Sequence, residues 1–274
     1  MFYRIIIVDR HRGMYADMAY QIMSMLQNQG DQVELVEEGG VAQPNTDTTR
    51  HIFLGTQYRN TQVPGGSIVT NFDNSEVILQ ILSREIIETC EVWDYSRDNI
   101  AFIEKMFPSA VCRLIELGYS PMLDLGSGYD EEEKDIDILF MGSVLPKREK
   151  ILSELTRRGA HVVRENFRYG QERADLIKRA KVCISIFNNH VTQCVSSSRF
   201  APILCNNGFI VCEQCSDALH EAKWSQFMIS VPYEDLVETA LTWLAQPKMC
   251  KAVADSSYAR FKGVAPIVHE RKRF

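Results

Sequence analysis

Four residues with the chemistry to hold an anion lie close together in the second half of the chain. Gly142 and Ser143 follow an apolar run, and Lys147 and Arg148 stand just before a helical pattern. Glycine lets the backbone approach a ligand, and a helix N-terminus offers N–H groups to an anion, to which the two cations add positive charge. The pattern suits a diphosphate. It is neither a GxGxxG fingerprint nor a P-loop, and a solvent-facing helix start with surface cations is the alternative.

Two further candidate ligand contacts follow along the chain. Arg199 lies at the start of a predicted helix, after Ser198 and a polar loop that contains Asn188. A cation there is unfavourable against the helix dipole, so we expect a ligand, or an acid of a neighbouring helix, to compensate it. Glu213 ends an apolar strand, where a carboxylate can accept from the two hydroxyls of a ribose or face solvent. We take all four residues as candidates for ligand binding.

The first half of the chain offers candidates for proton transfer. Asp9 and His11 directly follow the first predicted strand, and either side chain can accept a proton from a hydroxyl group. The alternative is a polar turn that only connects a strand to a helix. A magnesium-dependent role for Asp9, as in a response regulator, would need an adjacent second acid and a Lys after a later strand, and the sequence shows neither.

Two patterns that can bind metal favour structural roles. Asp135 and Asp137 form an Asp-x-Asp pair, but they enter a strand and so lie at the end of the sheet opposite to ligand sites. Cys212 and Cys215 form a CxxC pair without a second pair at zinc-site spacing, which leaves redox chemistry as the alternative. The simplest interpretation of the eight cysteines is buried thiols. We therefore expect no metal.

Strand and helix patterns alternate in two series along the chain. A segment at 118–134, with glycines, a proline and a run of acids, predicts a linker between the two series. Alternation with short connections implies parallel sheets that helices cover on both faces. The expected fold class is α/β, with two Rossmann-like domains at 1–125 and 126–274 whose parallel sheets face a cleft. Strands are predicted at 3–8, 32–36, 51–54, 67–71, 91–94, 110–117, 135–141, 161–164, 181–187, 209–212 and 227–231, and helices at 13–29, 75–90, 97–106, 147–158, 170–180, 197–206, 233–245 and 248–262.

Composition limits the partners and the location that we expect. The 274 residues are 45% hydrophobic and carry a net charge of −6, which argues against a protein that grips nucleic acid by bulk electrostatics. No apolar stretch approaches the ~20 residues of a membrane span. The start of the chain, 1–9, is a short apolar run ended by an acid, which predicts a strand rather than a signal peptide. We expect a cytoplasmic protein with no transmembrane segment, and a solvated basic stretch at 269–274.

Several segments resemble those of a known group of enzymes. The stretch VWDYSRDNI at 92–100, followed by GYSP at 118–121, resembles the end of the first domain in a group of bacterial and viral glycosyltransferases. That group is related to the group-one and spore-maturation (CgeB-like) glycosyltransferases. Further similar segments are 137–143, Lys147 with Arg148, Ser198 with Arg199, and 208–213.

The resemblance implies a fold and an assignment of residues. It implies a two-domain GT-B fold, a nucleotide-sugar donor held mainly by the second domain, an acceptor on the first domain and no requirement for metal. It assigns Gly142, Ser143 and Arg148 to the diphosphate, and Arg199 and Glu213 to the nucleotide-sugar. We therefore predict a transferase that moves a sugar from a UDP- or GDP-sugar to a hydroxyl acceptor such as a glycan. The nucleotide-sugar is a co-substrate, and no cofactor is expected.

The sequence departs from that group at two places. Larger members have a Glu shortly after the position of Arg199, where this chain has Ala201, so the Glu-x7-Glu pattern is absent. The opening loop also lacks the Gly-Gly of many members, and His11 or Asp9 is the expected base there. The alternative hypothesis is an inactive nucleotide- or sugar-binding module of the same fold.

Overall fold

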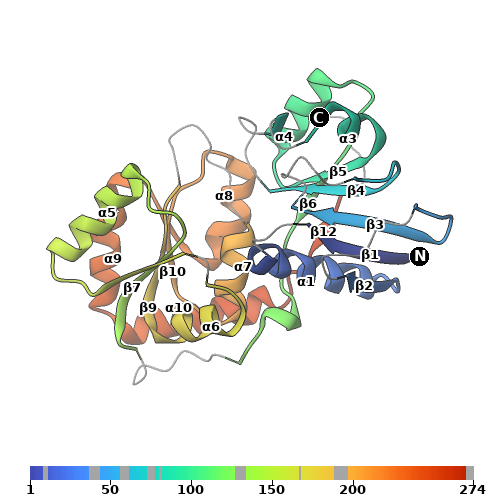
Figure 1. Cartoon of the computed structure of the whole chain (residues 1–274). Helices are drawn as coiled ribbons and strands as arrows, with labels where there is room; N and C mark the ends of the chain where they lie inside the picture. Colours follow the sequence, from blue (N-terminus) through green and yellow to red (C-terminus); the bar gives the residue numbers. More distant parts are fainter. Residues whose placement is uncertain are drawn as a thin grey trace. The chain divides into compact units, whose positions relative to one another are not determined.

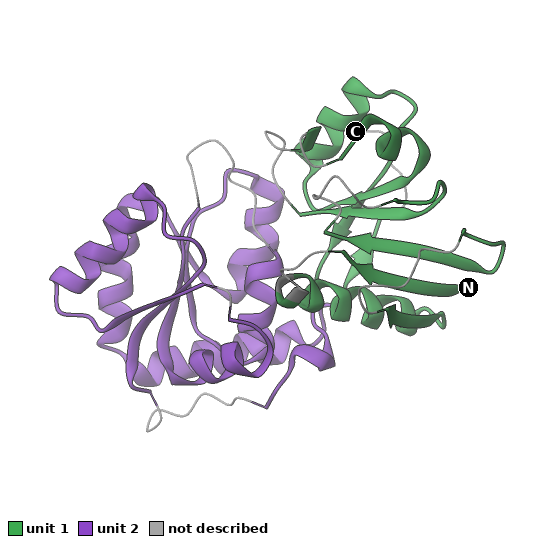
Figure 2. Ribbon diagram, in the orientation of Figure 1, with its two compact units in different colours: residues 1–118, 265–274 green, residues 119–264 purple. Residues whose placement is uncertain are grey.

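The chain forms two compact units in its computed structural model. Unit 1 comprises Met1–Gly118 and Ala265–Phe274, and unit 2 comprises Tyr119–Val264 (Figure 2). The residues that the structure describes are 1–8, 12–36, 44–55, 62–72, 78–79, 82–126, 134–166, 168–187 and 197–269.

Unit 1 is built on one sheet with strand order β12-β6-β5-β4-β3-β1-β2 (Figure 1). Every pair of neighbours is parallel except β12 with β6. The strands are β1 (Phe2–Ile7), β2 (Gln32–Val36), β3 (Thr49–Leu54), β4 (Ile68–Asn71), β5 (Glu91–Asp94), β6 (Val111–Glu116) and β12 (Ile267–Val268), and the helices are α1 (Arg12–Asn28), α3 (Arg84–Thr89) and α4 (Arg97–Met106).

Helices cover both faces of the unit 1 sheet. Ile5 and Ile7 point to one face, where they pack with residues of α1, and Ile6 points to the other face, where it packs with residues of α3 and α4. This division follows from the alternation of side chains along a strand. Because both faces are buried, the strand needs three consecutive isoleucines rather than an alternating pattern.

Unit 2 is built on a fully parallel sheet with strand order β11-β10-β9-β7-β8. Helices α5 and α9 cover one face of this sheet, and α6 and α7 cover the other (Figure 1). The strands are β7 (Ile136–Met141), β8 (Val162–Glu165), β9 (Ala180–Ser185), β10 (Ile210–Glu213) and β11 (Ile229–Val231); the helices are α5 (Pro146–Arg157), α6 (Gly170–Arg179), α7 (Ser197–Cys205), α8 (Ala218–Trp224), α9 (Leu236–Leu244) and α10 (Pro247–Phe261), with short 3₁₀ turns η1 (Pro121–Leu123), η3 (Ser225–Phe227) and η4 (Tyr233–Asp235).

The predicted fold class is confirmed, because each unit is an α/β unit of the Rossmann type, with a sheet that is parallel throughout in unit 2 and parallel except for β12 in unit 1. The division between the units differs from the expected boundary after residue 125. The backbone N–H of Tyr119 donates to Val264 O at 2.7 Å, and Ser120 is fully buried, so the first part of the expected linker is packed into unit 2.

The end of the described chain returns to unit 1. β12 pairs with β6, the N–H of His269 donates to Leu114 O at 2.9 Å, and His269 Nε2 lies 2.7 Å from a carboxylate oxygen of Glu116. His269 is therefore part of unit 1 rather than of a solvated tail, and the basic residues after it lie outside the described part. Among the described residues, no helix combines the length and the apolar character needed to cross a membrane.

Candidate functional site

The strand order of unit 2 defines where a ligand can bind. The chain leaves β7 toward β8 on one side and leaves β9 toward β10 on the other. The loops that follow β7 and β9 therefore diverge, and the carboxyl ends of these two strands form the switch point at which open α/β sheets bind ligands. The segment from Gly142 to α5 follows β7, and the segment that leads to α7 follows β9. Most of the predicted binding residues stand on these segments.

Gly142 brings the two predicted arginines together. A Cβ atom at this position would lie 3.8 Å from Nη1 of Arg148 and 3.9 Å from Nη2 of Arg199. The backbone φ of Gly142 is +139°, which side chains other than hydrogen rarely allow. Two guanidinium groups, one from α5 and one from α7, thus converge on the backbone of Gly142.

Arg148 is fixed and almost completely buried. Its side chain is held by two main-chain oxygens, because Nε donates to Ile186 O and Nη1 donates to Ser143 O, both at 2.8 Å. The guanidinium also lies 5.4 Å from the ring centre of Phe140. Burial and the like charge of Arg199 lower the pKa of Arg148 to about 9, and Glu213 acts in the opposite direction. The site therefore holds a cation that an anionic ligand would stabilise.

Glu213 and Lys147 form a buried ion pair beside these arginines. Lys147 Nζ lies 2.6 Å from one carboxylate oxygen of Glu213, and the other oxygen accepts from the N–H of Phe187 at 2.9 Å. The hydroxyl of Tyr233 donates to Lys147 O at 2.8 Å, and Lys147 Nζ lies 4.9 Å from its ring centre. Burial and the charge of Glu213 raise the pKa of Tyr233. Glu213 thus joins the ends of β10 and β9 to the start of α5, and does not face solvent.

A cavity of about 370 Å³ adjoins this ion pair. It is lined by residues 213–216, at the carboxyl end of β10, and by residues 232–234, at the carboxyl end of β11. Its size is that of a small-molecule pocket, and its lining mixes the Glu213 carboxylate with the Tyr233 ring.

Of the remaining predicted residues, two lie in the described part of the chain and three lie outside it. Ser143 is exposed, and its hydroxyl accepts from Asn166 Nδ2 at 3.4 Å. Ser198 lies in the first turn of α7, directly before Arg199. Asn188, Asp9 and His11 lie outside the described residues, so their predicted roles stay predictions. β1, which Asp9 and His11 follow, adjoins β3 at the switch point of the unit 1 sheet.

The structural interpretation of the Asp-x-Asp pair agrees with the observed contacts. Asp135 pairs with Arg179 at 2.6 Å, and Asp137 pairs with Lys181 at 2.6 Å, at the amino end of β7. Among the described residues, no group of three or more His, Cys, Asp or Glu side chains is placed to hold a metal ion.

The CxxC cysteines are buried. Burial raises the pKa of Cys212 to about 12, and its sulfur lies 3.1 Å from the Met228 sulfur, while Cys215 is 6% exposed. A thiol in this environment is a poor nucleophile.

Sequence reasoning missed several contributors to the site. Tyr233 and the main-chain groups of Ile186 and Phe187 hold the charged residues in place. No local pattern identifies a carbonyl or amide as a partner of a distant side chain. Lys147 was grouped with Arg148, but the structure gives the two cations different partners.

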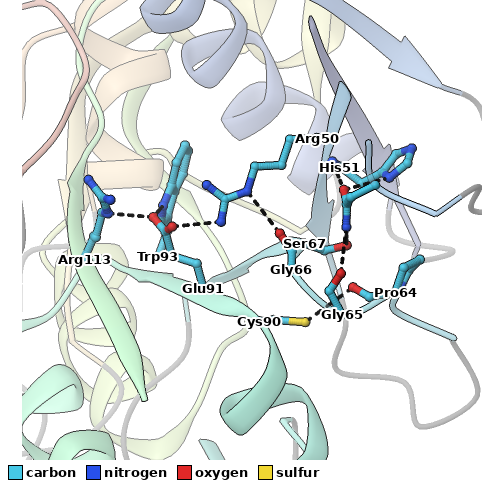
Figure 3. A network of polar contacts seen from close by, with 11 residues as sticks. Arg50, His51, Pro64, Gly65, Gly66, Ser67, Cys90, Glu91, Trp93 and Arg113 are labelled. Atoms are coloured by element: carbon cyan, nitrogen blue, oxygen red, sulfur yellow. Dashed lines mark hydrogen bonds and ion pairs between the residues drawn. The ribbon is translucent and has the colours of Figure 1, made fainter. Parts of the chain in front are cut away.

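A second polar network lies at the amino ends of the strands of the unit 1 sheet (Figure 3). The buried carboxylate of Glu91 accepts from Arg50 Nη2 at 2.8 Å and from Trp93 Nε1 at 2.7 Å, and it lies 2.7 Å from Arg113 Nε. This edge is opposite to the carboxyl ends of the strands. The network therefore links β3, β5 and β6 rather than contributing to a ligand site.

Comparison with known proteins identifies the fold. No family model matches the sequence. A curated relative, the uncharacterized protein L140 of Acanthamoeba polyphaga mimivirus, is 27% identical over 160 residues, which cover 56% of this chain and 50% of that protein. The match thus spans about half the length of the relative.

Solved structures of three glycosyltransferases are similar over nearly the whole chain. An alpha-glucosyltransferase (AGT) in complex with UDP has a TM-score of 0.61 at 9% identity, and covers 96% of this chain and 95% of its own; it has also been solved with UDP and a 13-mer DNA. T4 phage BGT in complex with UDP and Mn²⁺ has a TM-score of 0.56 at 10% identity, with 96% of both chains covered. WaaG, a glycosyltransferase involved in lipopolysaccharide biosynthesis, has a TM-score of 0.55 at 12% identity. The match covers 96% of this chain and 95% of WaaG. The chain therefore has the GT-B fold of glycosyltransferases.

Proposed function

We propose that this chain is a glycosyltransferase that moves a sugar from a UDP- or GDP-sugar to a hydroxyl acceptor. The convergence of Arg148 and Arg199 on Gly142, at the switch point of the unit 2 sheet, is the observation that carries the proposal. Two cations that meet at the backbone of a glycine form a site for a dianionic group. The UDP bound by the structural neighbours AGT and BGT agrees in chemistry with this site.

The arginines have a role in the reaction as well as in binding. When the bond between the sugar and the diphosphate breaks, negative charge grows on the leaving diphosphate. Arg148 is already fixed by Ile186 O and Ser143 O, so it stabilises that charge without first reorganising. Arg199 supplies the second positive charge from α7. The cavity beside Glu213 takes the nucleoside part of the donor.

Unit 1 is proposed to hold the acceptor and to activate its hydroxyl group. Asp9 and His11 follow the carboxyl end of β1, and we assign the base role to His11, with Asp9 as the other candidate. The acceptor is a glycan or another molecule with a hydroxyl group. A net charge of −6 makes nucleic acid an unfavourable partner.

We also propose that the reaction needs neither a metal nor a cofactor, because the arginines supply the charge that a divalent ion would otherwise provide. The neighbour BGT was solved with Mn²⁺, so this part of the proposal requires its own measurement. Each assay is therefore run with and without EDTA.

A thermal-shift screen against UDP, GDP, CMP, dTDP and their sugars tests the proposal. A ligand that binds only the folded state raises the melting temperature, by an amount that grows with its concentration over Kd. We expect a shift with UDP or GDP that survives EDTA, followed by donor hydrolysis or transfer. Binding without any turnover would instead identify a nucleotide-binding module of this fold. No shift with any nucleotide would refute both functions.

A further inference from the structure

The two cations at the start of α5 are held in different ways. Arg148 is bound to main-chain oxygens of Ile186 and Ser143, which follow the ends of β9 and β7. Lys147 is paired with a side chain, the carboxylate of Glu213. The other oxygen of that carboxylate accepts from the backbone N–H of Phe187. The side chains of Lys147 and Glu213 are 7% and 4% exposed. A buried pair of two side chains can separate when a ligand offers both members new partners.

We propose that this ion pair is an exchange pair, which makes donor binding depend on the diphosphate. The diphosphate takes Lys147, and the carboxylate oxygen of Glu213 that is thereby released accepts from the ribose hydroxyls of the same ligand. Lys147 is then the residue that excludes nucleosides without phosphate. The inference rests on the proposed function, since it assumes that a nucleotide occupies the cavity lined by Glu213.

Two energetic terms produce this discrimination. A nucleoside that reaches Glu213 must separate a buried ion pair and takes the carboxylate of Glu213 away from the ammonium of Lys147, which is costly. A nucleoside diphosphate separates the same pair but supplies a stronger anion at the same point. Glu213 tolerates the exchange, because the N–H of Phe187 still donates to it and Arg148 is near enough for the two charges to interact.

The exchange can be tested by measuring the binding of the nucleoside and of pyrophosphate separately, beside the binding of the whole nucleoside diphosphate. Isothermal titration calorimetry is performed with uridine, guanosine, inorganic pyrophosphate, UDP and GDP on the whole chain. In the Lys147→Met variant, Glu213 no longer has to give up its cation. We therefore expect nucleoside affinity to rise about tenfold, and pyrophosphate affinity to fall about tenfold. Simple electrostatics predicts no gain for a neutral nucleoside, so that gain is the diagnostic result.

The Glu213→Gln variant is expected to show the reverse pattern. Its amide oxygen can still accept from Phe187, while Lys147 no longer has a carboxylate partner at this position. Pyrophosphate affinity should therefore rise and nucleoside affinity should fall. Lys150→Ala, which removes an exposed cation from the same helix, is the matched control and should change neither affinity by more than about twofold. Lys147→Gln repeats the test with a polar side chain, in case the Met variant does not fold.

The outcomes separate this inference from the proposed function. If the wild-type chain binds neither UDP nor GDP, the proposed function and the exchange are both refuted. If the wild type binds a nucleoside diphosphate, but both Lys147 variants leave nucleoside affinity unchanged or weaker, only the exchange is refuted. The pair would then be a fixed part of the scaffold.

Discussion

At the scale of single residues, Arg148 and Arg199 differ in their contacts with the rest of the protein. Arg148 donates to two main-chain carbonyl groups, those of Ile186 and Ser143, in addition to carrying charge. Arg199 is half-buried in the first turn of α7, where a cation opposes the helix dipole. Arg148 therefore contributes to the fold as well as to the site, whereas Arg199 carries its charge against the helix dipole, beside the backbone of Gly142.

Substitution of the two arginines should separate these roles. Arg199→Ala is expected to lower turnover by about 10²–10³-fold, because one stabilising charge on the leaving diphosphate is lost. Its free energy of unfolding should stay within about 1 kcal/mol of the wild type. Arg148→Ala should lower both turnover and stability, the latter by roughly 1–3 kcal/mol, since the buried carbonyl of Ile186 loses its donor. Transfer assays and urea unfolding measure the two effects. An Arg199→Ala variant with wild-type turnover would remove Arg199 from the mechanism.

His51 is expected to make the stability of unit 1 depend on pH. It lies on β3 beside the network of Figure 3, and its N–H and Nδ1 both lie within 3.1 Å of Asn45 Oδ1. Burial, followed by the nearby charge of Arg4, lowers the pKa of His51 below its ordinary value of 6.5. The folded state therefore favours neutral imidazole, while the unfolded chain takes up a proton as the pH falls through 6.5.

The free energy of unfolding should accordingly decrease as the pH is lowered from 7.5 to 5.5, because the unfolded chain takes up a proton at His51. The His51→Asn substitution removes this proton uptake. Asn keeps a donor near the position of Nδ1 and does not titrate. We expect the variant to be less stable at pH 7.5 but to lose less stability on acidification than the wild type does. Urea unfolding at the two pH values, followed by the fluorescence of the buried Trp93, provides the comparison. Equal losses in both proteins would show that other groups cause the dependence.

At the scale of elements, prediction succeeded where the signal was local. Helix 97–106 was predicted with its observed bounds, because Ser96 caps it by accepting from the N–H of Asn99 and because Ile100 and Ile103 face the core. The order of strands and helices followed from hydrophobic runs in the same way. The parallel sheets could therefore be predicted from the sequence, whereas the order of the strands in each sheet, which sets the switch point, could not.

Elements and contacts that depend on distant residues were missed. β12 has two residues, and only its pairing with β6, about 150 positions earlier, makes it a strand. Helix α8 begins at a clear cap, Asp217, but its first turn presents the exposed Leu219 and no apolar stripe. The ion pair between Lys147 and Glu213 joins residues 66 positions apart. The candidate binding residues could be predicted from the sequence, but their pairing could not.

The junction between α7 and β10 shows how tightly the elements of unit 2 are packed. A Cβ atom on Gly208 would lie 2.5 Å from Ile203 Cγ2 and 2.9 Å from Ile177 Cγ2. Gly208→Ala should therefore lower the free energy of unfolding by about 1–3 kcal/mol through overpacking. Gly263→Ala, whose nearest neighbour would be Arg260 O at 3.4 Å, is the matched control with a much smaller effect. Thermal unfolding distinguishes the two, and equal midpoints would contradict the close packing of α6, α7 and β10.

At the scale of the whole molecule, the two units differ in how the chain builds them. Unit 2 is one continuous segment, Tyr119–Val264, whereas unit 1 needs Ala265–Phe274 in addition to Met1–Gly118. Residues Gly142, Lys147, Arg148, Arg199 and Glu213 all belong to unit 2, and so does the cavity beside them. The proposed base and the acceptor contacts belong to unit 1. Donor binding and transfer should therefore depend on different parts of the chain.

A fragment of residues 119–264 tests this separation. We expect it to fold, because both its sheet and its core are complete within the segment, and to bind the same nucleoside diphosphate as the whole chain. At 100 times Kd the ligand should stabilise it by ~2.7 kcal/mol. The fragment should transfer no sugar, since it lacks the proposed base, and the same fragment with Arg199→Ala controls for specific binding. A folded fragment that binds no nucleotide, although the whole chain does, would show that unit 1 supplies an essential part of the donor site.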